Sequence, residues 1–536
     1  MTSKLWWKDG VIYQIYPRSF ADSNGDGVGD LAGITAKLDY LAELGVDAIW
    51  LSPIYPSPNV DFGYDVSDYV DIHTQFGTLA DFDRLTAEAH RRGIRIVLDM
   101  VMNHTSDQHP WFQQSRSSRD NPYRDYYFWR DPKPGNKPPN NWLSVFGEEG
   151  WVPDPATGQM YFHMFYREQP DVNWRNPAVR REMLDVFRFW LERGVDGFRL
   201  DVFNSFFKDA DLKDNPTTLF GIRAFERQRH IHDIDQPEMM PLLQELRTLL
   251  DSYPERYAVG ETFLASAEKA AQYCGPDKLH GTFNFELLQS RWSPRAFIKA
   301  IQRWEQALAA DTWPPWVLNN HDSRRSATRY GGGEKDDRLK IAAALMLTQR
   351  GTPFLYYGEE IGMRDIHVPY REIQDRLGKK YWPIVPGRDG CRAPMQWDAS
   401  PNAGFSPAGV QTWLPPHPNY GMRNVEAQRA DPNSLWHFYR KLITLRRESA
   451  ALREGMFIPL TFDTYFILGY LRQTTDETVL VALNFSGRRK RLVLGGKLGS
   501  ANWEMLLSSK REQMGPLHGG LVALEPYEAV ILRLVS

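Results

Sequence analysis

Short apolar runs recur along the first two thirds of the chain, and turn-forming or polar residues separate them. They cover residues 11–17, 48–53, 96–101, 197–201, 258–262, 281–285, 316–322 and 352–358. Between most of these runs, apolar residues return at helical spacing and a glycine closes the pattern, as at Gly45 and Gly194. Eight strands that alternate with helices predict an α/β fold of the (β/α)8 TIM-barrel type.

The competing architecture is an open sheet that binds dinucleotides. No G-x-G-x-x-G pattern opens any of the predicted helices, and eight strands suit a closed barrel better.

Two stretches interrupt or follow this alternation. Between residues 101 and 197 no barrel strand is predicted, and a polar tract rich in Pro, Asn and Trp spans residues 130–142. After about residue 455 the pattern changes to alternating β-like runs at 465–471, 478–485, 491–494 and 529–534. We therefore predict a barrel from 1–103 and 175–455, an inserted domain at 104–174, and a C-terminal antiparallel β-sandwich at 456–536.

Composition narrows the possible partners. Among 536 residues, 64 Lys and Arg oppose 67 Asp and Glu, which gives a net charge of −3 and argues against nucleic acid or a polybasic membrane anchor. The sequence lacks a long apolar stretch and an apolar signal segment, and has two cysteines, so we expect a cytoplasmic protein that no membrane holds. Aromatic residues make 13% of the chain and could serve a core or stack on a ligand.

Carboxylates stand at the ends of several predicted strands. Asp201, Glu261 and Asp322 end the fourth, fifth and seventh runs, and active sites of TIM barrels lie at this end of the strands. Each alone could cap a helix or pair with an arginine, but three together favour acid/base chemistry.

The residues around two of these carboxylates suggest different roles. Arg199 leaves the same strand face as Asp201 and would favour its charged form, as a nucleophile needs. An apolar segment precedes Glu261 and would suit a general acid. Retaining glycoside hydrolases use such a pair of carboxyl groups, one as the nucleophile and the other as the general acid.

Four motifs carry a resemblance to a known family. Residues 99–106 (DMVMNHTS), 197–204 (GFRLDVFN), 259–263 (VGETF) and 319–322 (NNHD) resemble the ordered signature regions of the α-amylase family, family 13 of the glycoside hydrolases. The resemblance implies Asp201 as nucleophile, Glu261 as acid/base and Asp322 as transition-state stabiliser. It also implies that His104 and His321 bind sugar hydroxyls.

Within the family, the chain is more similar to the oligo-1,6-glucosidase and α-glucosidase branch. Residues 61–69 (DFGYDVSDY), 392–398 (RAPMQWD) and 169–173 (QPDVN) carry this similarity. It implies that Asp61 pairs with Arg392 behind the non-reducing glucose, and that Tyr64 stacks under the sugar ring. Phe146 and Phe165 are candidates for the pocket wall.

The expected function is therefore an exo-acting, retaining α-glucosidase for short α-1,4 or α-1,6 glucosides, with transglucosylation. Val202 matches members that accept α-1,6 bonds, whereas Ser323 and Ala393 depart from the usual pattern and leave the acceptor open. The alternative is a dedicated glucosyltransferase or isomerase, of the sucrose isomerase or trehalose synthase type. A non-catalytic barrel of the transporter-subunit type would lack the three acids. The partner is a small oligosaccharide or α-glucoside, and the protein would be a monomer or homodimer.

A turn after the first strand places oxygen ligands at alternate positions. Asp22, Asn24, Asp26 and Asp30 supply side chains and Val28 a carbonyl, which suits structural Ca²⁺ or, less often, Mg²⁺. Gly33 stands where an EF-hand has its bidentate Glu, so the tract instead resembles the short metal loop of the oligo-1,6-glucosidase branch. No organic cofactor is expected.

Overall fold

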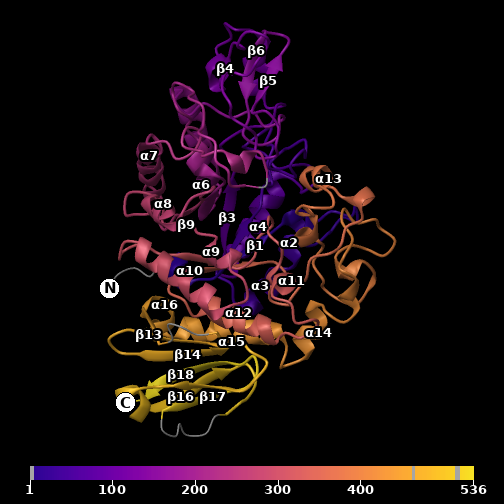
Figure 1. Ribbon diagram of the computed structural model, residues 1–536. Helices are drawn as coiled ribbons and strands as arrows, with labels where there is room; N and C mark the ends of the chain where they lie inside the picture. The colour runs from indigo at the N-terminus through magenta and orange to yellow at the C-terminus, as the bar shows by residue number, and fades with distance from the viewer. Residues whose placement is uncertain (1–4, 222, 461–464, 514–519, 536) are drawn as a thin grey trace. The chain divides into compact units, whose positions relative to one another are not determined.

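Eight strands form one parallel sheet in the computed structural model, which describes residues 5–221, 223–460, 465–513 and 520–535. In sheet order they are β10 (Pro315–Val317), β11 (Thr352–Tyr356), β1 (Ile12–Ile15), β2 (Ala48–Leu51), β3 (Arg95–Met100), β7 (Gly197–Leu200), β8 (Tyr257–Glu261) and β9 (Gly281–Phe283). The first residue of each strand lies within one position of the first residue of a predicted run. The TIM-barrel prediction is thereby confirmed (Figure 1).

The chain packs into two compact units. The first comprises residues 1–49, 88–95 and 283–536, and the second residues 50–87 and 96–282. The predicted domain boundaries follow the sequence pattern and not this division, and they stay a prediction.

The helices follow the capping and apolar patterns of the sequence. Helix α6 (Pro177–Glu192) begins after Asn176, whose side chain accepts the amide of Ala178, and has a proline in its first turn. Its buried side chains repeat at helical spacing from Val179 to Leu191. Just beyond its end, Gly194 has φ +91°, a left-handed conformation that favours glycine.

The other helices of the second unit are α5 (Pro110–Ser117), α7 (Met239–Asp251) and α8 (Ala267–Gln272), with 3₁₀ turns η2 (Arg124–Tyr126), η3 (Phe203–Ser205) and η4 (Phe225–Arg227). Helix α4 (Leu79–Arg91) belongs in part to each unit.

The first unit contains α1 (Trp6–Asp9), α2 (Leu31–Ala36), α3 (Leu38–Leu44), α9 (Glu286–Gln289), α10 (Pro294–Ala307), α11 (Ser326–Arg329), α12 (Asp337–Leu347), α13 (Arg376–Lys380), α14 (Val425–Ala430), α15 (Leu435–Glu448), α16 (Ala450–Glu454) and α17 (Gly496–Ser500). Its 3₁₀ turns are η1 (Pro17–Ser19), η5 (Tyr370–Glu372), η6 (Asp389–Arg392), η7 (Pro401–Gly404) and η8 (Pro418–Gly421). In the described ranges, no helix has the length and apolar character needed to cross a membrane.

The sequence predicts an insertion after the third strand, and the structure has a small antiparallel sheet there, between β3 and α6. Its strands are β4 (Trp129–Arg130), β6 (Gln159–Phe162) and β5 (Trp151–Asp154), in that order (Figure 1). Trp142 and Trp151 both lie against Phe162, at ring-centroid distances of 5.1 and 5.4 Å. Aromatic side chains therefore form the core of this insertion.

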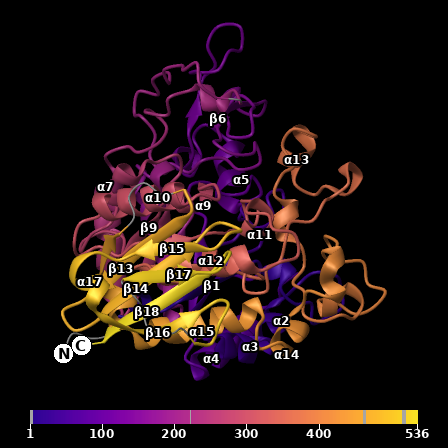
Figure 2. The same cartoon turned by 60° about the horizontal axis from the view of Figure 1, so that its bottom comes forward.

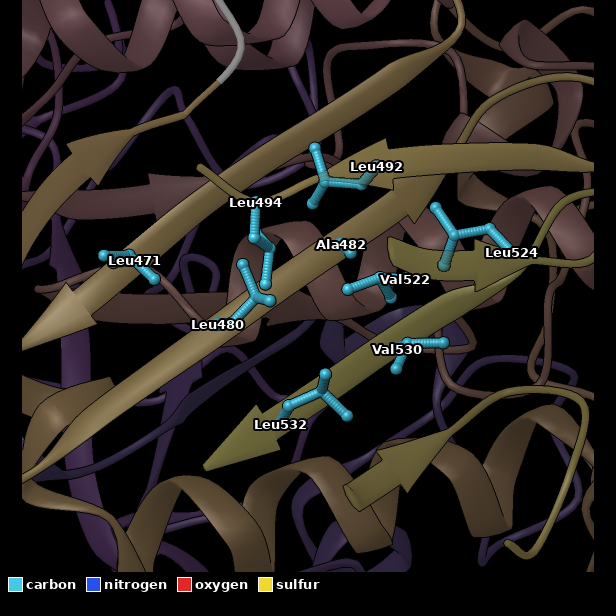
Figure 3. Close-up of a cluster of buried hydrophobic side chains, with 9 residues drawn as sticks. All are labelled: Leu471, Leu480, Ala482, Leu492, Leu494, Val522, Leu524, Val530 and Leu532. Atoms are coloured by element: carbon cyan, nitrogen blue, oxygen red, sulfur yellow. The ribbon is translucent and has the colours of Figure 1, made fainter. Parts of the chain in front are cut away.

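The C-terminal strands form two antiparallel sheets. The larger has the order β12 (Met456–Pro459), β13 (Ile467–Gln473), β14 (Thr478–Asn484), β18 (Ala529–Val535) and β16 (Asn502–Ser508), and the smaller pairs β15 (Lys490–Val493) with β17 (Leu521–Leu524) (Figure 2). One apolar cluster contains side chains from both sheets, among them Leu480, Leu492 and Val522 (Figure 3). The predicted C-terminal antiparallel β-structure is thereby confirmed.

Candidate active site

Strand register brings two of the predicted carboxylates side by side in the second unit. Strands β7 and β8 run parallel with Leu200 opposite Gly260, and the next residues along the two strands are Asp201 and Glu261. Neighbouring strands lie about 4.8 Å apart. The carboxyl ends of β7 and β8 therefore present adjacent acidic side chains.

Arg199 of β7 holds these carboxylates together. Its buried guanidinium lies 2.7 Å through Nη1 from Oδ1 of both Asp99 and Asp201, and Nη2 contacts Glu261 Oε2. Asp99 of β3 stands opposite Arg199 in the sheet register. One arginine thus meets carboxylates from three consecutive strands of the sheet.

Burial and charge set the electrostatics of this cluster. Burial raises the pKa of Asp99, against the opposing effect of the Arg199 guanidinium. Burial also works to lower the pKa of Arg199, but the carboxylates of Asp99 and Asp201 outweigh it and raise this pKa above its usual value. Arg199 therefore remains charged, and its positive charge favours the ionised form of Asp201.

The ion pair between Glu261 and Arg199 is a contact that the sequence does not predict. The apolar residues before Glu261 suggest an environment without a counter-charge, whereas the structure places the guanidinium against it. The contact arises because β3, β7 and β8 lie side by side in register in the sheet. The order of residues along the chain does not reveal this register.

Four further predicted residues form a connected group that contacts the same cluster through Tyr64. The Tyr64 hydroxyl donates to Asp99 Oδ2 at 3.1 Å, and the Tyr64 carbonyl accepts from His104 Nε2 at 2.9 Å. Phe165 lies 5.1 Å from the His104 ring and 6.2 Å from the Phe146 ring, between centroids. The structure thus brings four of the predicted binding residues into one connected group.

Residues that the sequence reasoning missed belong to this group as well. Phe263, which directly follows the Glu261-Thr262 pair, lies 5.9 Å from Phe165 between ring centroids. Gln169 donates through Nε2 to the Tyr64 carbonyl at 3.0 Å. Both residues stand inside motifs that the sequence analysis quotes, so their position in those motifs was the available signal.

A second cluster surrounds Asp322 in the first unit. Asp322 lies 2.9 Å from Arg392 Nη2 through Oδ1 and 3.2 Å from His321 Nε2 through Oδ2. Gln14 Nε2 is 2.8 Å from His321 Nδ1, and the Tyr16 ring stacks on the His321 ring at 5.9 Å. The structure therefore brings together the three residues of this unit that were predicted to act on the sugar: His321, Asp322 and Arg392.

Arg388 is a further member of the Asp322 cluster that the sequence reasoning missed. Its Nη1 lies 3.6 Å from Asp322 Oδ1, and its Nη2 lies 3.0 Å from Asp375 Oδ1. Burial works to raise the pKa of Asp375, but Arg388 outweighs it and lowers that pKa to about 2. Asp375 therefore stays ionised and holds the Arg388 guanidinium by an ion pair. The sequence pointed to Arg388 only through its position four residues before Arg392.

The predicted pair of Asp61 with Arg392 joins residues of different units and stays a prediction. In its own unit, Asp61 lies within a loop that the Asp65 carboxylate holds: Asp65 accepts the amides of Val60 at 2.8 Å and Asp61 at 3.0 Å. Burial raises the pKa of Asp65 to about 6.

The predicted cation loop is held by its own hydrogen bonds. Asp22 accepts the amides of Gly25 at 2.7 Å and Gly27 at 2.9 Å, and Asp30 accepts the amide of Gly33 as the N-cap of α2. The oxygen donors suit a hard cation. However, the described residues contain no group of three or more His, Cys, Asp or Glu side chains that could hold a metal ion, so the cation stays a prediction.

Comparisons with known proteins match the chain to one family. The family described as "Alpha amylase, catalytic domain" matches residues 14–455. A probable alpha-glucosidase of Rhizobium meliloti is 45% identical over 90% of this chain and 89% of its own length, and an oligo-1,6-glucosidase of Parageobacillus thermoglucosidasius is 41% identical over 99% of both.

Solved structures agree as well. The alpha-glucosyl transfer enzyme XgtA has a TM-score of 0.94 and 41% identity, over 99% of this chain and 100% of that one. The trehalulose synthase MutB from Pseudomonas mesoacidophila has a TM-score of 0.91 and 35% identity over the same shares. The family match, the barrel and the four motifs lead to one conclusion: the chain belongs to the α-amylase family of glycoside hydrolases, close to oligo-1,6-glucosidases and α-glucosidases.

Proposed function

We propose that the protein is an exo-acting, retaining α-glucosidase that releases glucose from the non-reducing end of short α-glucosides. The observation that carries this proposal is the adjacency of Asp201 and Glu261 at the ends of β7 and β8, where both contact Arg199. Retaining glycosidases need two carboxyl groups about 5–5.5 Å apart, and neighbouring parallel strands supply such a spacing.

In the proposed reaction, Asp201 attacks the anomeric carbon while Glu261 protonates the departing glycosidic oxygen. A glucosyl ester on Asp201 results, and water that Glu261 deprotonates then hydrolyses it, so the anomeric configuration is retained. Arg199 keeps Asp201 in the charged form that a nucleophile requires. Loss of negative charge at Asp201 on ester formation weakens this ion pair, and hydrolysis restores it.

Asp322 would take the third role, stabilising the transition state. His321 and Arg392 hold its two oxygens, so the carboxylate is oriented before a sugar arrives. We further propose that Asp61, Tyr64, His104 and His321 bind the terminal glucose, and that Phe146 and Phe165 line the pocket.

A second candidate function is glucosyl transfer or sucrose isomerisation. The similarity to a glucosyl transfer enzyme and to a trehalulose synthase favours it, because all of these reactions share the glucosyl-enzyme intermediate and differ in the acceptor. Product analysis separates the candidates: maltose, isomaltose, sucrose and trehalose are each offered, and free glucose is measured against new disaccharides.

The central test combines substitution with stereochemistry. We expect Asp201→Ala and Glu261→Gln to abolish turnover of p-nitrophenyl α-glucoside, and we expect NMR to show the α-anomer of glucose as the first product. Near-normal turnover by either variant, or the β-anomer first, contradicts the proposed mechanism.

A further inference from the structure

A fully buried ion pair lies behind the His104 side of the candidate site. Lys208 Nζ is 2.9 Å from Asp171 Oδ2, and both side chains have no exposed surface. Lys208 follows the turn after β7, and Asp171 belongs to the segment inserted between β3 and α6. Because burying two charges is costly, such a pair persists only where further hydrogen bonds satisfy its remaining atoms.

The side-chain amide of Asn103 bridges the two charges. Its Oδ1 accepts from Lys208 Nζ at 3.3 Å and from the Ser205 hydroxyl at 3.1 Å, whereas its Nδ2 donates to Asp171 Oδ2 at 3.1 Å. An ammonium can only donate and a carboxylate can only accept. The ion pair therefore allows one orientation of the Asn103 amide.

This orientation decides the hydrogen bonds of the next residue. Asn103 Nδ2 lies 3.2 Å from His104 Nδ1, so this ring nitrogen faces a donor and must accept. His104 Nε2 lies 2.9 Å from the Tyr64 carbonyl, which can only accept, and 3.1 Å from Gln169 Nε2, which itself donates to the same carbonyl at 3.0 Å. With Nδ1 accepting, the proton of a neutral ring is on Nε2 and is donated to Tyr64. The charge of Lys208, acting through the Asn103 amide, and the Tyr64 carbonyl therefore favour the same tautomer of His104.

The same ion pair anchors the inserted segment at the point where His104 meets it. Asp171 Oδ1 accepts the amide of Met164 at 2.8 Å, and the backbones of His104 and Asp171 form an antiparallel bridge. Phe165, whose ring lies against His104, directly follows Met164.

We propose that Lys208 is a positioning residue, which fixes the tautomer and orientation of His104 through Asn103 and holds the inserted segment against it through Asp171. The consequence for catalysis rests on the proposed function, in which His104 binds the terminal glucose. The consequence for the His104 ring does not depend on that function.

The first experiment measures the ring directly. In protein labelled with ¹⁵N-histidine, the His104 signals are assigned by their absence in His104→Gln. We expect Nδ1 to have the chemical shift of an unprotonated nitrogen and Nε2 that of a protonated one. In Lys208→Met this difference should shrink or reverse, while Lys213→Met, a half-exposed lysine further along the same loop, should leave it unchanged. Unchanged His104 shifts in Lys208→Met overturn the proposal.

The second experiment separates positioning from folding. Lys208→Met leaves a buried carboxylate without its partner, so we expect both a lower Tm and a KM for maltose about tenfold higher, the effect of one lost hydrogen bond. Adding Asp171→Asn removes the stranded charge and should restore much of the Tm but not the KM. Recovery of KM together with Tm contradicts a positioning role. If the wild-type enzyme hydrolyses no glucoside, the proposed function fails while the ¹⁵N experiment still tests the positioning.

Discussion

At the scale of single residues, Arg199 joins the acids of the candidate site. Its planar guanidinium reaches Asp99, Asp201 and Glu261 at once, which the point charge of a lysine cannot do. We expect Arg199→Lys to lower kcat/KM for p-nitrophenyl α-glucoside by about a hundredfold or more, since charge-assisted hydrogen bonds are lost. Arg193→Lys, which alters a more exposed pair with Asp83, is the matched control and should retain activity. A normal kcat/KM in Arg199→Lys contradicts this role.

A buried glutamate of the first unit, Glu359, gives the stability of the protein a pH dependence. Burial raises the pKa of Glu359 to about 7 from an ordinary 4.5, and Tyr439 of α15 donates to its Oε1 at 2.9 Å. Between these two pH values the folded protein holds a proton that the unfolded chain releases. The contribution of Glu359 to stability therefore falls as the pH rises from about 4.5 to about 7.

Glu359→Gln keeps an acceptor for Tyr439 but does not titrate. We expect it to match the wild type in urea unfolding near pH 5 and to exceed it near pH 8, by on the order of 1–3 kcal/mol. The control is Glu426→Gln on the exposed face of α14, which should unfold like the wild type at both pH values. Identical pH dependence in wild type and Glu359→Gln would show that the buried group does not titrate in this range.

At the scale of elements, apolar patterning was sufficient for the barrel but not for the site. All eight strands were predicted, because each is a buried run with polar residues at its carboxyl end. Arg388 and Lys208 gave no comparable signal, since each acts through partners that are distant in sequence: Asp322 lies 66 positions before Arg388 and Asp171 lies 37 before Lys208. The ends of strands can be predicted from the sequence, whereas ion pairs between residues distant in sequence can be identified only once the fold is known.

The turn before α2 is the element on which the cation prediction depends. Asp26 accepts the amide of Val28 at 2.9 Å and is exposed, so its substitution should disturb the turn little in the absence of a metal ion. If a cation binds as predicted, EDTA lowers the Tm of the wild type, Ca²⁺ restores it, and Asp26→Ala responds less. An unchanged Tm in EDTA, with no metal found by elemental analysis, removes the cation from the protein.

At the scale of the whole molecule, the high aromatic content is mostly structural. Trp142, Trp151, Trp190, Trp304, Trp316 and Trp436 are among the largest fully buried side chains. Trp50, which is also buried, donates through Nε1 to Asp99 Oδ2 at 3.3 Å. Aromatic residues therefore serve both the core and the candidate site, and the composition alone could not show which residues serve which.

The C-terminal sheets belong to the same compact unit as Asp322, and specific contacts join them to the barrel helices. The Tyr470 hydroxyl of β13 accepts from Gln349 Nε2, two residues beyond α12, at 2.9 Å, and the carbonyl of Phe485, just after β14, accepts from Trp292 Nε1, between α9 and α10, at 3.2 Å. We therefore expect the sheets to unfold together with the part of the barrel in this unit, and not as an independent domain.

Leu480→Ala tests this expectation in the cluster of Figure 3. Leu480 of β14 is fully buried, and its truncation leaves a cavity that typically costs about 2–5 kcal/mol. If the sheets and this part of the barrel unfold as one unit, Leu480→Ala should lower the Tm, and the variant should lose glucosidase activity at that same lower temperature. Leu521→Ala, the same change at a side chain that is 37% exposed, should alter both temperatures little. Activity that survives above the unfolding temperature of the Leu480→Ala sheets would show that the C-terminal structure is independent of the barrel.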